Sequence, residues 1–123
     1  MAWWEWLLIA VAGAFGASLR YIVESAVSTR FDAFPAGTLV VNLTGSFVLG
    51  LLTGLALYHG VGGAPREVLG TGFVGAYTTF SAFSLETAAL IEDGETRLAL
   101  ANVGVSLAGG GLLGAAGWGL AAL

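Results

Sequence analysis

The sequence predicts an all-α integral membrane protein, a four-helix bundle that forms a single domain over residues 1–123. The 123 residues are 57% hydrophobic and only 10% charged, and their mean hydropathy is +0.88. A soluble domain of this size is far less apolar. The charged residues fall in short clusters that leave four uncharged stretches. Since a helix needs roughly 20 apolar residues to cross a bilayer, each stretch marks one span.

The uncharged stretches place the spans, and the connections between them are short. The four predicted spans cover residues 3–23, 35–58, 68–91 and 98–122. Three tryptophans near the N-terminus and Trp118 near the C-terminus fit an interfacial aromatic belt, with both termini on one side of the membrane. Since the connections are too short to hold a soluble active site, any function must lie within the spans or at their mouths.

Charge and cysteine content exclude several classes of function. The net charge of −4 argues against nucleic acid as a partner, because binding to nucleic acid needs basic patches. Without cysteine, the chain has no disulfide, thiolate metal site or cysteine nucleophile. The first and third connections carry more arginine than the second, which has only Arg66. Taken literally, this bias places the first and third connections in the cytoplasm, but a protein that inserts both ways round would also show so small a difference.

The patterns that could indicate an enzyme lack their structural context. The sequence GTGFVG at residues 70–75 has the spacing of a dinucleotide-binding loop, but no strand precedes it and it lies inside a span. His59 is the only histidine, and at the end of a span we expect it to cap a helix or to be solvated. Neither a catalytic triad nor a mid-membrane carboxylate pair can be assembled. The sequence therefore indicates that the chain is not an enzyme.

The twenty glycines indicate how the spans pack. Gly50 with Gly54, and Gly110 with Gly114, are four-residue pairs that let helix backbones approach closely. Four spans make a thin bundle. Polar groups such as Asn42 are easier to hide from lipid if two copies associate. We therefore expect a dimer.

Polar residues recur at helical spacing in the second and fourth spans. Asn42, Gly45 and Ser46 share one face of the second span. Asn102 and Ser106 repeat the i, i+4 spacing in the fourth span, where hydrogen bonding between helices would explain them equally well. These faces are candidates for the lining of a polar path through the membrane.

The third span has the most unusual composition. The stretch GFVGAYTTFSAFSLE, residues 72–86, carries five hydroxyl side chains, including that of Tyr77, inside an apolar segment. Phe80 and Phe83 share a helical face. An aromatic ring presents a positive edge, which can attract an anion without binding it as tightly as a buried lysine or arginine would. The span therefore suits an ion path.

These motifs resemble one family of membrane proteins. GAFGASLRY (13–21), PAGTLVVNLTGSFVLG (35–50) and GFVGAYTTFSAFSLE (72–86) closely resemble the small bacterial and archaeal fluoride channels, the Fluc or CrcB family, and the resemblance covers nearly the whole chain. It implies a broken third helix, an antiparallel dual-topology dimer with two pores, and a structural sodium ion at the dimer interface. The implied function is fluoride-selective ion conduction, giving passive export of fluoride across the cell membrane.

The resemblance also implies roles for individual residues. The fluoride pathway would be lined by Asn42, Phe80, Ser81, Phe83 and Ser106. A vestibule or gate would use Arg20 and Glu86. The sodium ion would be bound by the backbone carbonyls of Gly75 and Thr78.

Two positions depart from the family pattern, and other interpretations stay open. Ala82 stands where the family usually has threonine, and Asn102 stands where a tyrosine is common. Some members pair with a paralogue, so a heterodimer is an alternative to the homodimer. A small multidrug exporter has a similar length, but it would carry a carboxylate inside the first span, whereas Glu5 and Glu24 lie at its ends. A tetraspan subunit that transports nothing would leave the phenylalanines replaceable.

Overall fold

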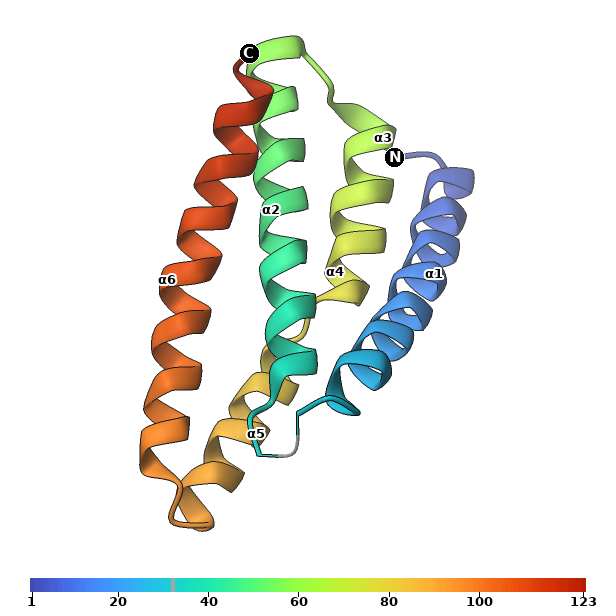
Figure 1. Ribbon diagram of the computed structural model, residues 1–123. Coiled ribbons are helices and arrows are strands. Elements are labelled where there is room, and N and C mark those ends of the chain that lie inside the picture. The colour runs from blue at the N-terminus through green and yellow to red at the C-terminus, as the bar shows by residue number, and fades with distance from the viewer. Residues whose placement is uncertain (32) are drawn as a thin grey trace.

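In the computed structural model, which describes residues 1–31 and 33–123, every regular element of the described chain is helical. Four stretches are long and apolar enough to cross a membrane: α1 (Trp3–Ser28), α2 (Ala36–His59), the segment Gly63–Glu92, and α6 (Thr96–Ala121). Figure 1 shows these stretches side by side, with both termini at the same end of the bundle. The predicted all-α membrane bundle is confirmed.

The helices extend beyond some of the predicted span limits. α1 continues to Ser28 rather than ending at residue 23, and the third stretch begins at Gly63 rather than at 68. Hydropathy locates the part of a helix that lies in hydrocarbon. The helix itself can continue into the membrane interface, where charged side chains such as Arg66 reach water.

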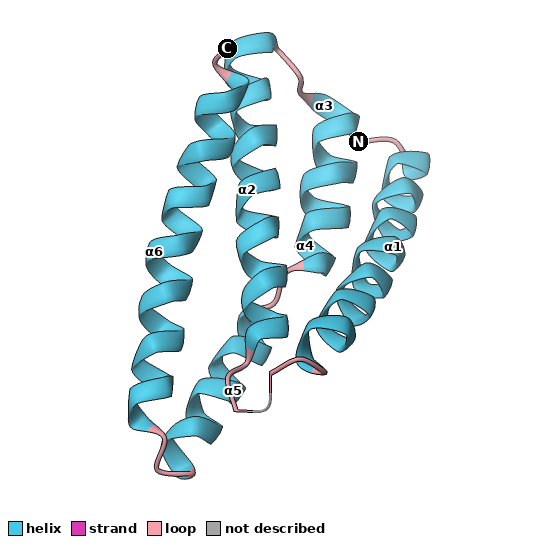
Figure 2. Ribbon diagram, in the orientation of Figure 1, coloured by secondary structure: helices cyan, strands magenta, loops and turns pink. Residues whose placement is uncertain are grey.

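The third span is broken in its middle, as predicted. It consists of α3 (Gly63–Arg66), the π-helical segment η1 (Glu67–Val74), α4 (Gly75–Tyr77) and α5 (Phe80–Glu92). Between α4 and α5, Thr78 and Thr79 are extended, with φ/ψ of −83°/159° and −150°/123°, and Figure 2 shows this break as a short loop. The Thr79 hydroxyl accepts a hydrogen bond from the Ala82 amide at 3.2 Å and so caps α5.

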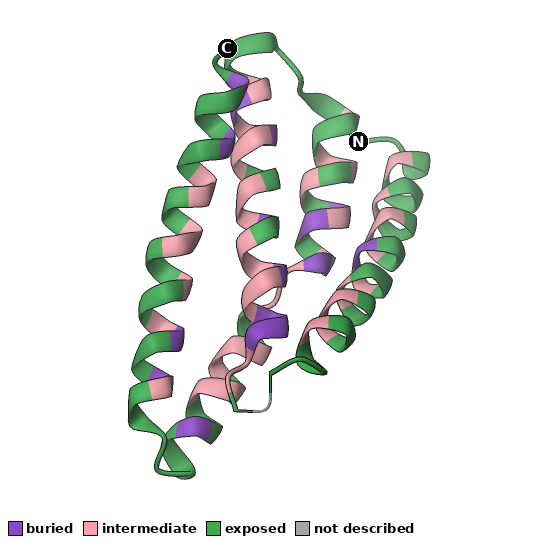
Figure 3. Cartoon of the chain, in the orientation of Figure 1, coloured by how far each residue is buried: buried purple, intermediate pink, exposed green. Residues whose placement is uncertain are grey.

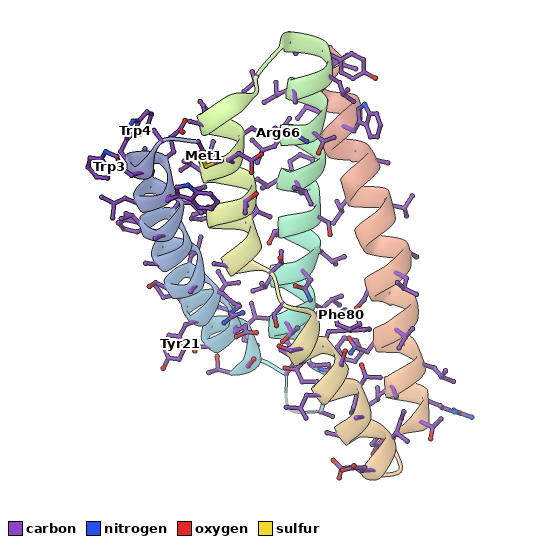
Figure 4. All side chains as sticks on the ribbon, turned by 180° about the vertical axis from the view of Figure 1, so that it is seen from behind. Met1, Trp3, Trp4, Tyr21, Arg66 and Phe80 are labelled. Carbon is purple, nitrogen blue, oxygen red and sulfur yellow. The ribbon has the colours of Figure 1, made fainter. Side chains whose placement is uncertain are left out.

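The break moves the third span from one neighbour to another. Before it, η1 and α4 pack against α1, and after it α5 packs against α6. Most of the outer surface of α1 and α6 is exposed (Figure 3). It is also apolar: Phe15 is 68% exposed and Leu112 is 72% exposed. Such faces suit contact with lipid. Trp3 and Trp4 point away from the bundle at the start of α1, as Figure 4 shows.

Glycines bring α2 and α6 into close contact along their length. A Cβ added at Gly117 would collide with the Phe47 carbonyl, and one added at Gly50 would collide with the Gly114 carbonyl. The predicted role of glycine in close backbone approach is therefore confirmed. Gly50 and Gly114, each taken from a predicted pair, contact each other within one chain.

We expect Gly117→Ala to destabilise the protein, because the added methyl group would force α2 and α6 apart at a cost of roughly 1–3 kcal/mol. Gly111→Ala is the matched control. It adds the same methyl group in the same helix where nothing lies within 4 Å, and should stabilise the helix by up to about 1 kcal/mol. Thermal unfolding in detergent would measure both. Equal melting temperatures would contradict the packing argument.

Candidate functional site

The break in the third span is held in place by the side chain of Asn42. Its Nδ2 group donates to the Thr79 carbonyl at 2.8 Å, and its Oδ1 atom accepts from the Thr79 amide, also at 2.8 Å. Backbone groups inside a membrane need protein partners when they leave a helix. One amide side chain on α2 thus satisfies both backbone groups of a residue on the neighbouring span.

Two backbone carbonyls at the break lose the donors that a continuous helix would give them. In such a helix the Gly75 carbonyl would accept from the Thr79 amide, and the Thr78 carbonyl from the Ala82 amide. Those amides are instead bound to Asn42 Oδ1 and to Thr79 Oγ1. The two carbonyl oxygens are left as hard ligands at the break in the helix, the kind of group that binds sodium in membrane proteins. The donor set therefore fits the sodium ion that the resemblance implies.

Two pockets border the break and share Thr79. The first, about 250 Å³, has an uncharged lining of Asn42, Gly45, Ser46, Leu49, Val74, Thr78, Thr79 and Phe80. The second, about 320 Å³, is lined by Arg20, Glu24, Thr79, Ser81, Ala82 and Leu85. The structure thus brings Asn42 together with Phe80, and Arg20 together with Ser81. The predicted shared face of Asn42, Gly45 and Ser46 is confirmed.

The two phenylalanines lie on the first turn of α5. Their ring centroids are 5.7 Å apart and the ring planes are tilted by 47°, so the predicted shared face is confirmed. Phe80 is 79% exposed in the single chain and lies beside the break (Figure 4). An aromatic ring this exposed, next to an uncharged polar pocket, can present its edge to an ion or contact a second molecule.

The two polar residues of α6 have different surroundings. Asn102 is 2% exposed, and its side chain donates a hydrogen bond to the Thr87 hydroxyl at 2.9 Å. This hydrogen bond joins α6 to α5. The buried Ser106 hydroxyl has no partner within the described chain. A buried polar atom of this kind is uncommon and is able to bind a water or an ion.

Glu86 is connected to two residues, Thr38 and Glu24, for which the sequence predicted no role in the site. The Thr38 hydroxyl lies 2.8 Å from Glu86 Oε1 and 3.0 Å from Glu24 Oε1. The other Glu86 oxygen is buried and has no partner among the described residues. Thr38 lies in the motif PAGTLVVNLTGSFVLG, residues 35–50, but the sequence does not indicate which groups its hydroxyl contacts. Arg20 forms no ion pair with any residue that the structure describes.

The remaining candidate, His59, has a structural role. Its Nε2 atom lies 2.7 Å from the Ala121 carbonyl at the end of α6, so it caps a helix as predicted. Within residues 1–31 and 33–123, no three histidine or acidic side chains are grouped as metal ligands would be. A cation bound at the break would therefore depend on backbone oxygens.

The fold and the site define a small multi-pass membrane protein whose polar groups converge on a broken helix. A family model described as "CrcB-like protein, Camphor Resistance (CrcB)" matches residues 7–118. The chain belongs to this CrcB family. The family predicted from the three motifs is thus confirmed, as is the prediction that the chain is not an enzyme.

Several relatives cover most of both chains. The chain is 47% identical over 116 residues to fluoride-specific ion channel FluC 1 of Leifsonia xyli subsp. xyli. This alignment covers 93% of this chain and 82% of the relative. It is 45% identical over 105 residues to fluoride-specific ion channel FluC of Methanocaldococcus jannaschii, covering 85% and 84%. It is 49% identical over 114 residues to FluC 1 of Streptomyces avermitilis, covering 91% and 90%.

We expect Asn42→Ala to expose the Thr79 amide to hydrogen exchange, because the side chain that binds it is lost. Exchange should accelerate by up to about tenfold, the order of one intramolecular hydrogen bond. Asn42→Asp keeps an acceptor for this amide and should retain most of the protection. Site-resolved hydrogen–deuterium exchange compares the variants, with Ser46→Ala as a control on the same face of α2. Equal protection in Asn42→Ala and the unmodified chain would show that Asn42 does not hold the break.

Proposed function

We propose that this chain is a fluoride-selective ion channel that gives passive export of fluoride from the cytoplasm. Relatives named fluoride-specific ion channel, at 45–49% identity over most of the chain, support the choice of ion. The observation that carries the proposal is the pocket beside the helix break. Its lining has no charged residue and combines the amide of Asn42, the hydroxyl of Ser46 and the ring of Phe80.

An uncharged lining suits fluoride for a physical reason. Fluoride is small and strongly hydrated, so a pore must replace its water with other favourable contacts and still release the ion. Amide and hydroxyl donors and ring edges provide moderate attraction. A buried arginine would hold the anion more tightly, and the chain has no lysine or arginine at residues 31–65 or 67–96. Arg20, in the second pocket, would instead attract anions toward the mouth.

The direction of transport follows from the membrane potential. Fluoride enters cells from acid surroundings as neutral hydrofluoric acid, which dissociates inside. A potential that is negative inside favours the exit of an anion by about 2.3 kcal/mol per 100 mV. Export therefore needs only a selective path, with no ion pump and no enzymatic step.

The pathway is completed, in this proposal, by a second copy in the opposite orientation. One protomer leaves Phe80 and Gly75 exposed and the pocket beside Asn42 open. Covering these groups with a partner would keep polar atoms away from lipid. The small arginine bias between the connections is compatible with insertion in both orientations. A homodimer meets these needs most simply, and a heterodimer with a paralogue would meet them with the same geometry.

The break is also the proposed site of a structural sodium ion at the dimer interface. The carbonyls of Gly75 and Thr78 lack their helical donors because Asn42 and Thr79 bind those donors. Two carbonyls from each copy around a two-fold axis would surround a cation with oxygen, without any carboxylate. The ion would also offset the partial negative charge at the end of α4.

In liposomes, the purified chain should pass fluoride much faster than chloride. Phe80→Ile and Phe83→Ile should each slow fluoride efflux by about tenfold or more, because an aliphatic side chain has no positive edge to offer the ion. Phe15→Ile is the matched control, since Phe15 lies on the exposed face of α1. A fluoride electrode would follow the efflux. Equal chloride flux, or normal flux in both α5 variants, would contradict the proposal, and no flux of either anion would favour a subunit that transports nothing.

The melting temperature of the protein in detergent should rise with sodium concentration, because a ligand that binds only the folded dimer stabilises it by RT ln(1 + [Na⁺]/Kd). Replacing sodium with N-methylglucamine at constant ionic strength should lower the melting temperature and favour monomers in size-exclusion chromatography. Readdition of sodium should reverse both changes. If neither the melting temperature nor the dimer fraction changes with sodium concentration, the cation site is refuted. That result would not test fluoride conduction.

A further inference from the structure

One hydroxyl group joins two carboxyl groups near the end of the bundle where α2 begins. Thr38, on the first turn of α2, lies 3.0 Å from Glu24 Oε1 on α1 and 2.8 Å from Glu86 Oε1 on α5. A threonine hydroxyl has one proton, so it can donate to only one of the two carboxyl groups. The second contact becomes a hydrogen bond only if the other carboxyl group carries a proton and donates it to the Thr38 oxygen.

We propose that Glu24 and Glu86 share one proton through Thr38 at neutral pH, and that Glu24 is a positioning residue of the ion pathway. We call these three residues the carboxyl triad. In this arrangement one carboxyl group donates to the Thr38 oxygen, and Thr38 donates to the other, ionised carboxylate. The two hydrogen bonds then link α1, α2 and α5, and each of them has its own proton.

Burial makes a second negative charge unfavourable at this place. Thr38 is 5% exposed, and one oxygen of Glu86 is buried without a partner in the described structure. A buried carboxylate oxygen without a hydrogen bond costs free energy, and a second ionised carboxylate beside it adds repulsion. A protonated carboxyl group lowers both costs.

Among the described residues that line the two pockets beside the triad, Arg20 is the only cation. Arg20, one turn before Glu24 on α1, lines the same pocket as Glu24 but forms no ion pair with a described residue. The beginning of α2, where Thr38 lies, favours one negative charge through its helix dipole. On the other side, Asp93 lines a pocket of about 360 Å³ together with Glu86 and adds negative charge. α6 contributes no residue to either of these pockets.

The triad bears on the proposed fluoride path because Glu24 lies beside the break. Glu24 shares its pocket with Thr79 and Ser81, at the start of α5. With one proton the triad carries a single negative charge and ties α5 to α1 and α2. When the proton is lost at alkaline pH, the second negative charge repels an incoming anion and one hydrogen bond loses its donor. This consequence rests on the proposed function, and fluoride efflux should therefore fall as pH rises.

Infrared difference spectroscopy on the full chain tests the shared proton without measuring transport. Between about pH 6 and pH 9 exposed carboxyl groups are already ionised, so a carboxylic acid carbonyl band that disappears in this range reports a retained proton. We expect the band in the unmodified chain and its absence in both Glu24→Gln and Glu86→Gln, because each amide can donate to Thr38 in place of the acid. Glu92→Gln, at an exposed position, should keep the band. Absence of the band from the unmodified chain, or its persistence in both triad variants, would overturn the proposal.

Fluoride efflux from liposomes tests the positioning role. Efflux through the unmodified chain should fall by about tenfold from pH 6 to pH 9, the order of one hydrogen bond to a charged group, and Glu24→Gln should flatten this profile. Thr38→Ser keeps the hydroxyl and should keep the profile, whereas Thr38→Val should lose it. A profile of Glu24→Gln that matches the unmodified chain would refute the role of Glu24. If no variant passes fluoride at any pH, the proposed function fails, and the infrared band still decides whether the proton is shared.

Discussion

The structure depends on the pair of hydrogen bonds between the side chain of Asn42 and the backbone of Thr79. A broken helix inside a membrane exposes backbone groups to a medium that cannot bind them. The amide of Asn42 offers one donor and one acceptor at the distance that both groups of Thr79 need. Without such a partner a continuous helix would be favoured, and the carbonyls of Gly75 and Thr78 would then bind their usual donors.

The same break sets the position of the functional groups. Because the third span changes neighbours at Thr78 and Thr79, its first half packs on α1 and its second half on α6. The first turn of α5 then carries Phe80 and Phe83 next to an uncharged pocket. A single backbone feature therefore provides oxygen ligands suited to a cation and ring edges suited to an anion, on neighbouring residues.

Glycines pack the helices closely along the bundle, and charged side chains lie at its ends. Gly50 and Gly117 let α2 and α6 approach so closely that backbone atoms fill the contact, which leaves the opposite faces for lipid or a partner. Charged side chains lie toward the ends of the spans. There the Thr38 hydroxyl connects Glu24 with Glu86, and this contact links three helices near the mouth of the proposed path.

The sequence by itself determined the four spans, the use of glycine for close helix packing, the shared face of Phe80 and Phe83 and the family, because hydropathy, small-residue spacing and motifs are local properties. The bonds of Asn42 to Thr79, of Thr38 to two glutamates and of Asn102 to Thr87 were decided only by the tertiary structure. These partners lie on different spans. In a helix that is apolar on every side, periodicity does not encode the rotation about the axis, so only packing selects which polar groups meet.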